Sequence, residues 1–130
     1  MIDVHNLNGT YVDVGPGKRG AAVPGGPAFW QALMTGQVNL QGEWLMTAST
    51  SEGDWPHWEM HPNGEEVVLL VSGSTDFELE IDGERTTVEL RNPCDYVLVP
   101  RGAWHIARNA RAAQLVVLTA GEGTQHRADG

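Results

Sequence analysis

The chain has 130 residues, 41% of them hydrophobic and 19% charged, which is the size and composition of one soluble globular domain. Its formal net charge of −9 argues against nucleic acid or an anionic membrane surface as a partner, since both attract basic proteins. No apolar run approaches the roughly 20 residues of a membrane span. A single cysteine, Cys94, excludes an internal disulfide and a multi-cysteine zinc site. The unpaired cysteine and the lack of signal-peptide features predict a cytoplasmic protein.

The first part of the chain predicts few regular elements. A short strand is expected at residues 10–14. The glycine- and proline-rich residues 15–27 are typical of a loop, and residues 28–36 predict a short helix that Gly36 ends. Apolar residues alternate over 40–50, which predicts a strand.

The rest of the chain predicts short strands separated by tight turns. The turn signals are Gly73-Ser74 and, for a hairpin, Asp82-Gly83. The expected strands are residues 55–61, 66–71, 77–81, 86–90, 96–99, 104–107 and 114–119. Residues 121–130 are polar and are expected to be a frayed tail. Residues 1–130 therefore predict one all-β domain, an antiparallel sandwich or barrel with one or two short helices.

Charge is unevenly distributed along the sequence. Acidic residues crowd residues 52–89, whereas arginines prevail over 91–111. One interpretation is that the two segments form strand faces that attract each other within the fold. The other is that some of the acids hold a cation while some of the arginines bind an anionic substrate.

Imidazole and carboxylate groups gather on the predicted strand 55–61 and at the start of the next predicted strand, 66–71. His57, Glu59 and His61 are two residues apart, so their side chains lie on one face of a strand. Glu66 opens the next strand, and a tight hairpin returns it toward His61. Nitrogen and oxygen donors that converge from adjacent strands indicate a divalent-metal site.

Other candidate residues lie outside this group. His105 is the internal histidine left to supply a further ligand, because His5 and His126 lie near the termini and are expected in solvent. Arg101, in a predicted turn, is a candidate contact for an anionic substrate, and Trp44 is a candidate for the mouth of a substrate pocket.

At this point the sequence resembles the cupin superfamily, which carries two sequence motifs at fixed spacing. The positions that match the first motif, over residues 53–73, are Glu59, His61, Glu66 and Gly73. The positions that match the second motif, over residues 94–109, are Pro100, Gly102, His105 and Asn109. This sequence departs from the family at the first histidine, where Glu59 stands, and at the first glycine of the second motif, where Cys94 stands.

The resemblance implies a jelly-roll barrel with a metal inside, and commonly a homodimer. His61, Glu66 and His105 fall on the ligand positions, and Glu59 completes a set of two histidines and two glutamates, with His57 as the alternative to Glu59. The expected cofactor is a divalent transition metal (Mn, Fe, Ni or Zn), and two carboxylates favour the harder Mn and Fe(II). A barrel that has lost its metal and keeps a polar cluster is the alternative.

Three functions remain open at this stage. The first is a metal-dependent oxygenase, isomerase or lyase acting on a small organic acid or sugar-like molecule. The second is a non-catalytic cupin that binds a metal or a small ligand, and the third is a metal-free structural relative. Proteins with the cupin fold have many different activities, so the fold alone does not decide among these three functions.

Overall fold

The computed structural model describes residues 2–38, 40–120 and 122–129, and most of them lie in strands. The first elements are β1 (Thr10–Gly15), a 3-10 turn η1 (Pro16–Lys18), β2 (Arg19–Pro24), α1 (Pro27–Met34), β3 (Trp44–Gly53) and β4 (His57–Met60). The remaining elements are β5 (Glu66–Ile81), β6 (Glu84–Leu90), β7 (Tyr96–Val99), β8 (Trp104–Thr119) and β9 (Gln125–Ala128). Every strand pair in the described residues is antiparallel.

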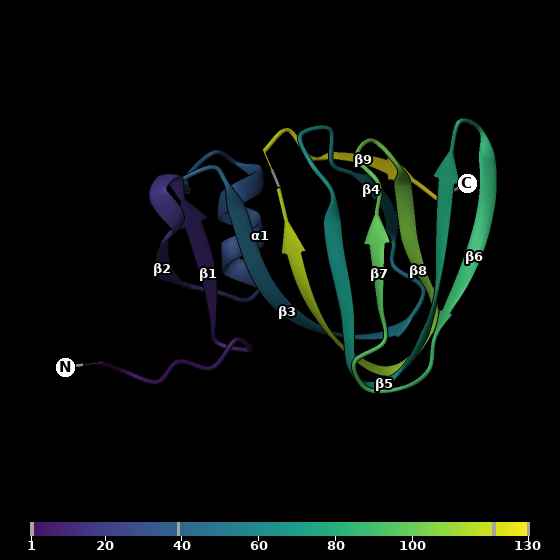
Figure 1. Cartoon of the computed structure of the whole chain (residues 1–130), viewed down its shortest axis with the longest axis horizontal. Coiled ribbons are helices and arrows are strands. Elements are labelled where there is room, and N and C mark those ends of the chain that lie inside the picture. Colours follow the sequence, from purple (N-terminus) through teal and green to yellow (C-terminus); the bar gives the residue numbers. More distant parts are fainter. Residues whose placement is uncertain (1, 39, 121, 130) are drawn as a thin grey trace.

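The two longest strands, β5 and β8, form a ribbon along the middle of the sheet. They pair from Glu66 opposite Thr119 at one end to Glu80 opposite Trp104 at the other. The register shifts between Leu70 and Asp76, where the ribbon bends and curls the sheet into a half-barrel (Figure 1). The bend turns one continuous ribbon into two facing walls.

Shorter strands widen each wall. On the first wall β3 pairs with the second half of β8, and β7 pairs with the start of β5. On the second wall β6 pairs with the end of β5, while β4 pairs with β8 at Glu59 opposite His105 and also with β9. The hydrophobic core fills the space between the walls, with Val68, Phe77 and Leu115 fully buried.

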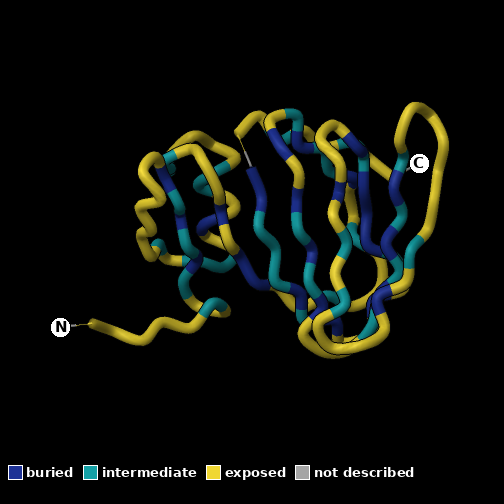
Figure 2. Tube along the Cα trace, in the orientation of Figure 1, coloured by how far each residue is buried: buried dark blue, intermediate teal, exposed yellow. Residues whose placement is uncertain are grey.

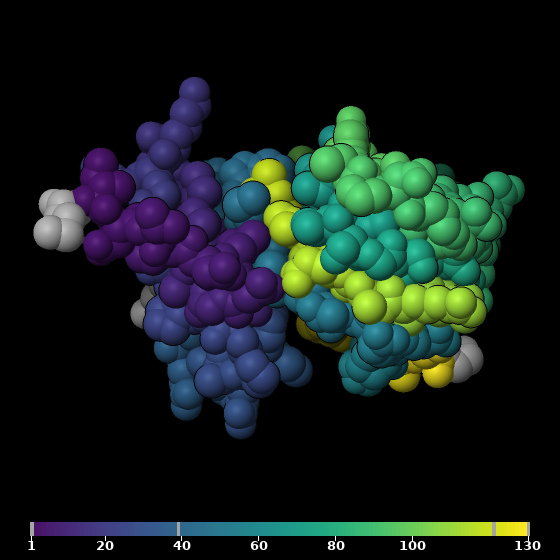
Figure 3. Space-filling model, turned by 90° about the horizontal axis from the view of Figure 1, so that it is seen from below, coloured from purple at the N-terminus to yellow at the C-terminus, as the bar shows by residue number. Residues whose placement is uncertain are grey.

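A separate N-terminal lobe lies at one end of the molecule (Figures 1 and 3). The β1–β2 hairpin joins the sheet through β3, and α1 packs beside it. Tyr11, Phe29 and Leu45 form the lobe's own core, with the Tyr11 and Phe29 rings edge to face at 5.1 Å. No helix in the described ranges is long and apolar enough to cross a membrane. The exposed strand edges and loops surround the buried inner positions (Figure 2).

The all-β antiparallel class with one short helix is confirmed, and the helix begins and ends within two residues of the prediction. The loop predicted over 15–27 is wrong, because β2 lies inside it. The turn predicted at Gly73-Ser74 is a bend within β5, and the strands predicted at 104–107 and 114–119 are one strand, β8.

The frayed tail predicted for residues 121–130 is also wrong over Gln125–Ala128. These residues form β9, which pairs with β4 along its whole length, from His57 opposite Ala128 to Met60 opposite Gln125. Their polar composition hid the strand, because the buried apolar alternation that reveals most strands is absent. Gly121 and Gly130 lie outside the described residues.

The bend in the ribbon depends on a glycine. Gly73 has φ of 77°, and an added Cβ would collide with the backbone of Arg111 and Ala112. We expect Gly73→Ala to lower the free energy of unfolding by about 3 kcal/mol, since a left-handed alanine alone costs about 1–2 kcal/mol and the collision adds to it. Urea unfolding measures the loss.

Gly83→Ala is the matched control for this substitution. Gly83 has a similar φ of 82°, but nothing lies within 4 Å of its added Cβ. We expect a loss of only about 1 kcal/mol there. Equal losses at both glycines would show that the close approach of the two strands at Gly73 is not what matters.

Candidate metal centre

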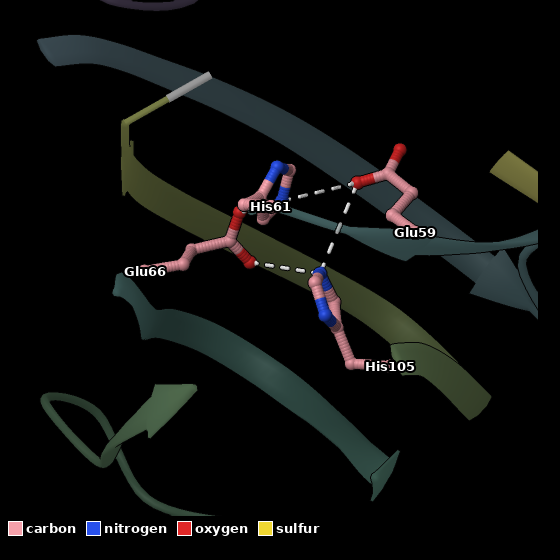
Figure 4. A group of neighbouring side chains, drawn as sticks. All are labelled: Glu59, His61, Glu66 and His105. Carbon is pink, nitrogen blue, oxygen red and sulfur yellow. Dashed lines mark ion pairs between the residues drawn. The ribbon is translucent and has the colours of Figure 1, made fainter. Parts of the chain in front are cut away.

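Four polar side chains converge inside the half-barrel from three strands and one loop. Glu59 lies on β4, His61 directly follows β4, Glu66 is the first residue of β5, and His105 is the second residue of β8 (Figure 4). Period-two alternation turns the side chain of Glu59 inward, and its cross-strand partner His105 lies on the same face. On the opposite wall, Glu66 lies beside Thr119, its cross-strand partner in β8.

The carboxylate of Glu66 bridges the two imidazoles. His61 Nε2 lies 2.7 Å from Glu66 Oε2, and His105 Nε2 lies 3.2 Å from Glu66 Oε1. Glu59 Oε2 stands slightly further away, 3.9 Å from His61 Nε2 and 4.0 Å from His105 Nε2. Each residue offers a ligand atom, and these four atoms all lie within 4.8 Å of one another.

Three of the four residues are buried, and their inward atoms lack hydrogen-bond partners. His61, Glu66 and His105 are 5%, 2% and 0% exposed, whereas the Glu59 side chain is 33% exposed and marks the open side of the site. Among the described residues, His61 Nε2, Glu66 Oε1 and His105 Nε2 lie close to a facing carboxylate or imidazole but make no well-aligned hydrogen bond. Buried polar atoms without hydrogen bonds are uncommon, and here all three point at one spot.

Neighbouring groups orient the donors. His105 Nδ1 lies 3.1 Å from the carbonyl oxygen of Ala103, which only accepts, so Nδ1 carries the hydrogen and Nε2 of the neutral ring is a free electron-pair donor. The Thr119 hydroxyl donates to Glu66 Oε2 at 2.8 Å. The Phe77 ring stacks on His105 with centroids 5.6 Å apart and keeps that side dry.

The electrostatics favour a charged carboxylate at the centre. Burial raises the pKa of Glu66, but the interactions with His105 and His61 outweigh burial and lower it to about 2. Burial lowers the pKa of His105, but Glu66 outweighs that effect and the pKa is raised. Two imidazole nitrogens and two carboxylates, one of them held ionised, are a donor set that suits a divalent transition metal.

The remaining candidates from the sequence lie apart from this group. His57 is exposed at the start of β4 and does not belong to the four converging residues. Arg101 is exposed in the turn whose Gly102 N–H donates to the His61 carbonyl at 3.0 Å. Trp44 lines a pocket of about 270 Å³, whose other lining residues are Gly42, Glu43, Asn63, Ala120 and Glu122. The four central residues do not line that pocket, and contact of Trp44 or Arg101 with substrate stays a prediction.

Two residues near the C-terminus contact the site and were missed by the sequence analysis. Thr124 Oγ1 lies 2.8 Å from His61 Nδ1. His126, which was expected in solvent, is 43% exposed, but its Nε2 lies 3.6 Å from Glu59 Oε1. Their two-residue spacing was the available signal, because side chains two positions apart in extended chain lie on one side; Thr124 directly precedes β9 and His126 is its second residue.

Comparison with known proteins supports the fold. No family model and no curated protein matches the chain. A solved structure of a serine-to-alanine mutant of oxalate decarboxylase from Bacillus subtilis matches 68% of this chain with a TM-score of 0.53 and 22% identity. Peruvianin-I, described as a cysteine peptidase from Thevetia peruviana latex, matches 68% of the chain with a TM-score of 0.55 and 14% identity.

The chain has a cupin fold. Within it, Glu59, His61, Glu66 and His105 form a His/Glu group that resembles a metal site. The chain spans 24% of the oxalate decarboxylase and 58% of Peruvianin-I, so at this identity the likeness concerns the fold alone.

The pKa shifts predict a stability maximum for the metal-free protein. Glu66 has a pKa of about 2 in the folded state and 4.5 as its ordinary value, so it stabilises the fold above about pH 4.5 and loses this effect as the pH falls toward 2. His105 has a raised pKa, so its contribution is complete below 6.5 and is lost as the pH rises through the folded value. In EDTA, unfolding free energy should therefore peak between about pH 4.5 and 6.5.

Glu66→Gln separates this effect from the other titrating groups. The variant cannot hold the buried negative charge. The drop in its unfolding free energy below pH 4.5 should therefore be smaller than that of the wild type by about 3 kcal/mol, the equivalent of the Glu66 pKa shift. Urea unfolding at several pH values measures both proteins. An identical drop in unfolding free energy below pH 4.5 in both proteins would contradict the charge balance described for Glu66.

Proposed function

We propose that Glu59, His61, Glu66 and His105 bind a divalent transition metal ion and that the protein uses this centre to bind or transform a small organic acid or sugar-like molecule. The observation that carries the proposal is the set of buried, inward atoms without hydrogen bonds, His61 Nε2, Glu66 Oε1 and His105 Nε2. A metal ion would satisfy all three at once, and the Ala103 carbonyl already leaves His105 Nε2 free to bind.

The donor set favours manganese or Fe(II) within the wider group of Mn, Fe, Ni and Zn. Glu59 and Glu66 together carry the charge that neutralises a divalent ion, and carboxylate oxygens suit the harder metals. One of the matching structures concerns the Mn(II) centres of the Bacillus subtilis oxalate decarboxylase. These Mn(II) centres belong to the other protein, and they support manganese as the first metal to test here.

An enzymatic role would use the open side of the site. A bound metal would polarise a carbonyl or carboxylate oxygen of a small substrate. Glu59 is the carboxylate that solvent reaches and the one furthest from the imidazoles. It can therefore accept a proton from a substrate at the entrance, while the buried Glu66 stays ionised between the two histidines. Oxygenase, isomerase and lyase reactions all fit this arrangement.

A second candidate is a cluster that works without metal. The contacts of 2.7 and 3.2 Å between Glu66 and the imidazoles balance charge by themselves when a histidine is protonated. A barrel of this kind would bind a small ligand or serve a structural role. Elemental analysis of untagged protein separates the candidates, because a stoichiometric transition metal supports the first and its absence after metal-supplemented purification supports the second.

Metal titration of two histidine variants tests the ligand set. We expect His61→Ala to weaken Mn(II) binding about 100-fold or more, since it removes a direct donor, and His57→Ala to leave affinity within twofold. Isothermal titration calorimetry on the metal-free protein measures both. A loss for His57→Ala comparable to that for His61→Ala would show that His57, rather than Glu59, is the ligand from β4.

We further propose a homodimer formed through the outer face of the first wall. Cross-strand rows of apolar side chains cover this face, and the rows are Met46, Leu118, Val67 and Leu98, then Ala48, Val116, Leu69 and Tyr96. Tyr96 and Leu98 are 61% and 53% exposed. A second copy of the chain is the occupant that fits this face. Each chain carries a net charge of −9, so two copies are expected to meet through a face without charged side chains, where the two sheets can pack against each other.

Leu98→Arg tests the dimer. The substitution places two like charges near the centre of the proposed interface, so we expect a monomer mass by light scattering at concentrations where the wild type is dimeric. Ile81→Arg is the control, since Ile81 is 42% exposed at the far end of β5. A monomeric wild type across micromolar concentrations would overturn the proposal.

A further inference from the structure

The segment around β9 presents two different faces, one to the metal centre and one to the outer surface. Thr124 and His126 lie on the inner face, opposite β4, where His126 pairs with Glu59. Arg127 and Asp129 lie on the outer face, as the period-two alternation requires. β9 runs beside β4, and therefore lies next to the strand that carries the first ligand (Figure 1).

The inner face contacts two of the four candidate ligands on the side away from the centre. Thr124 Oγ1 lies 2.8 Å from Nδ1 of His61, whose Nε2 points at Glu66. His126 Nε2 lies 3.6 Å from Oε1 of Glu59. The other oxygen of Glu59, Oε2, points at the two imidazoles (Figure 4). Each contact leaves the metal-facing atom of the ligand free.

These two ligands are the ones that most need support. His61 lies beyond the last residue of β4, so the ladder between β4 and β9 does not fix its backbone. Glu59 is the most exposed of the four and the furthest from its neighbours. Glu66 and His105, in contrast, are held by Thr119 and by the Ala103 carbonyl within the barrel.

The outer face fastens the segment to the second wall. Asp129 accepts hydrogen bonds from Arg108 and, at 3.2 Å, from the indole N–H of Trp58. The Arg108 guanidinium holds the pKa of Asp129 at about 2, so the carboxylate stays charged. Arg127 stacks over Trp58 and Trp104 at 5.1 and 4.6 Å and donates to Glu80 at 2.9 Å.

We propose that residues 124–129 act as a latch that completes the metal centre, with Thr124 and His126 as positioning residues for His61 and Glu59. The inference rests on the proposed metal binding. If Nδ1–H of His61 donates to the Thr124 oxygen, Nε2 is left as the lone-pair donor, which is the tautomer that a metal requires. His126 restrains the exposed carboxylate of Glu59, and the Asp129–Arg108 contact keeps the strand in register.

Mn(II) titration of the full-length metal-free protein tests the latch. Thr124→Val and His126→Ala should each weaken binding about 10-fold to 100-fold, as for groups that orient a ligand from behind. Gln125→Ala is the matched control, because Gln125 is exposed and lies between the two, as the first residue of β9. It should leave affinity within twofold. Asp129→Asn should weaken Mn(II) binding by less than Thr124→Val does. The double variant with both substitutions should weaken binding by less than the product of the two single fold-changes.

Two readouts distinguish positioning from a general structural effect. Thr124→Ser keeps the hydroxyl and should restore affinity to within about threefold of wild type. The Mn(II) electron paramagnetic resonance spectrum of the loaded His126→Ala protein should change, since the Glu59 carboxylate loses its fixed orientation. Thermal unfolding of the metal-free variants reports any loss of fold independently.

Each outcome decides one of the two ideas. If wild type binds no Mn(II), Fe(II), Ni(II) or Zn(II), the proposed function fails and the latch has no centre to complete. If wild type binds and both Thr124→Val and His126→Ala remain within twofold, the latch alone is overturned. It is also overturned if Thr124→Ser fails to rescue, or if Gln125→Ala weakens binding as much as its neighbours do.

Discussion

The bend in the β5–β8 ribbon is the constraint on which the site depends. Glu66 begins β5 and pairs with Thr119, whereas His105 is the second residue of β8 and pairs with Leu79. Leu79 lies 13 positions after Glu66 on the same strand, which in a straight strand would span about 43 Å at ~3.3 Å per residue. The two functional atoms nevertheless lie 3.2 Å apart, because the ribbon folds over at Gly73 and brings its ends together. A flat sheet of the same sequence would have no site.

Burial of a carboxylate at this meeting point constrains the rest of the interior. An isolated buried carboxylate would take up a proton, so Glu66 needs the two imidazoles and the Thr119 hydroxyl around it. His105 in turn needs the Ala103 carbonyl at its other nitrogen and the Phe77 ring against its face. The apolar core and the polar centre are therefore one packed unit, and Phe77 belongs to both.

The sequence was informative where chemistry and local periodicity coincide. The two-residue spacing of Glu59 and His61 and the strand start at Glu66 predicted that these side chains converge, but His57 fitted the same spacing. The resemblance to the cupins was needed to place His105 and Glu59 in the ligand set. The continuity of β5 and β8 was not predictable, because Gly73 is as typical of a turn as of a bend whose partner strand comes close. β9 was missed for a different reason. Its stability comes from the contacts of Arg127 and Asp129 with Trp58 and Arg108, which are distant in sequence.

The uneven distribution of charge in the sequence is resolved by the two faces of the second wall. Alternation along β5 sends Glu78 and Glu80 outward, where they meet Arg108 and Arg127. The same alternation gives the inner face Phe77 and Leu79. Five acids of the acid-rich segment thus lie within ion-pair distance of arginines outside the barrel, as expected for strand faces that attract each other: Asp54, Asp76, Glu78, Glu80 and Glu89. Glu59 and Glu66 are left inside without an arginine partner, and their combined charge is the complement of one divalent ion.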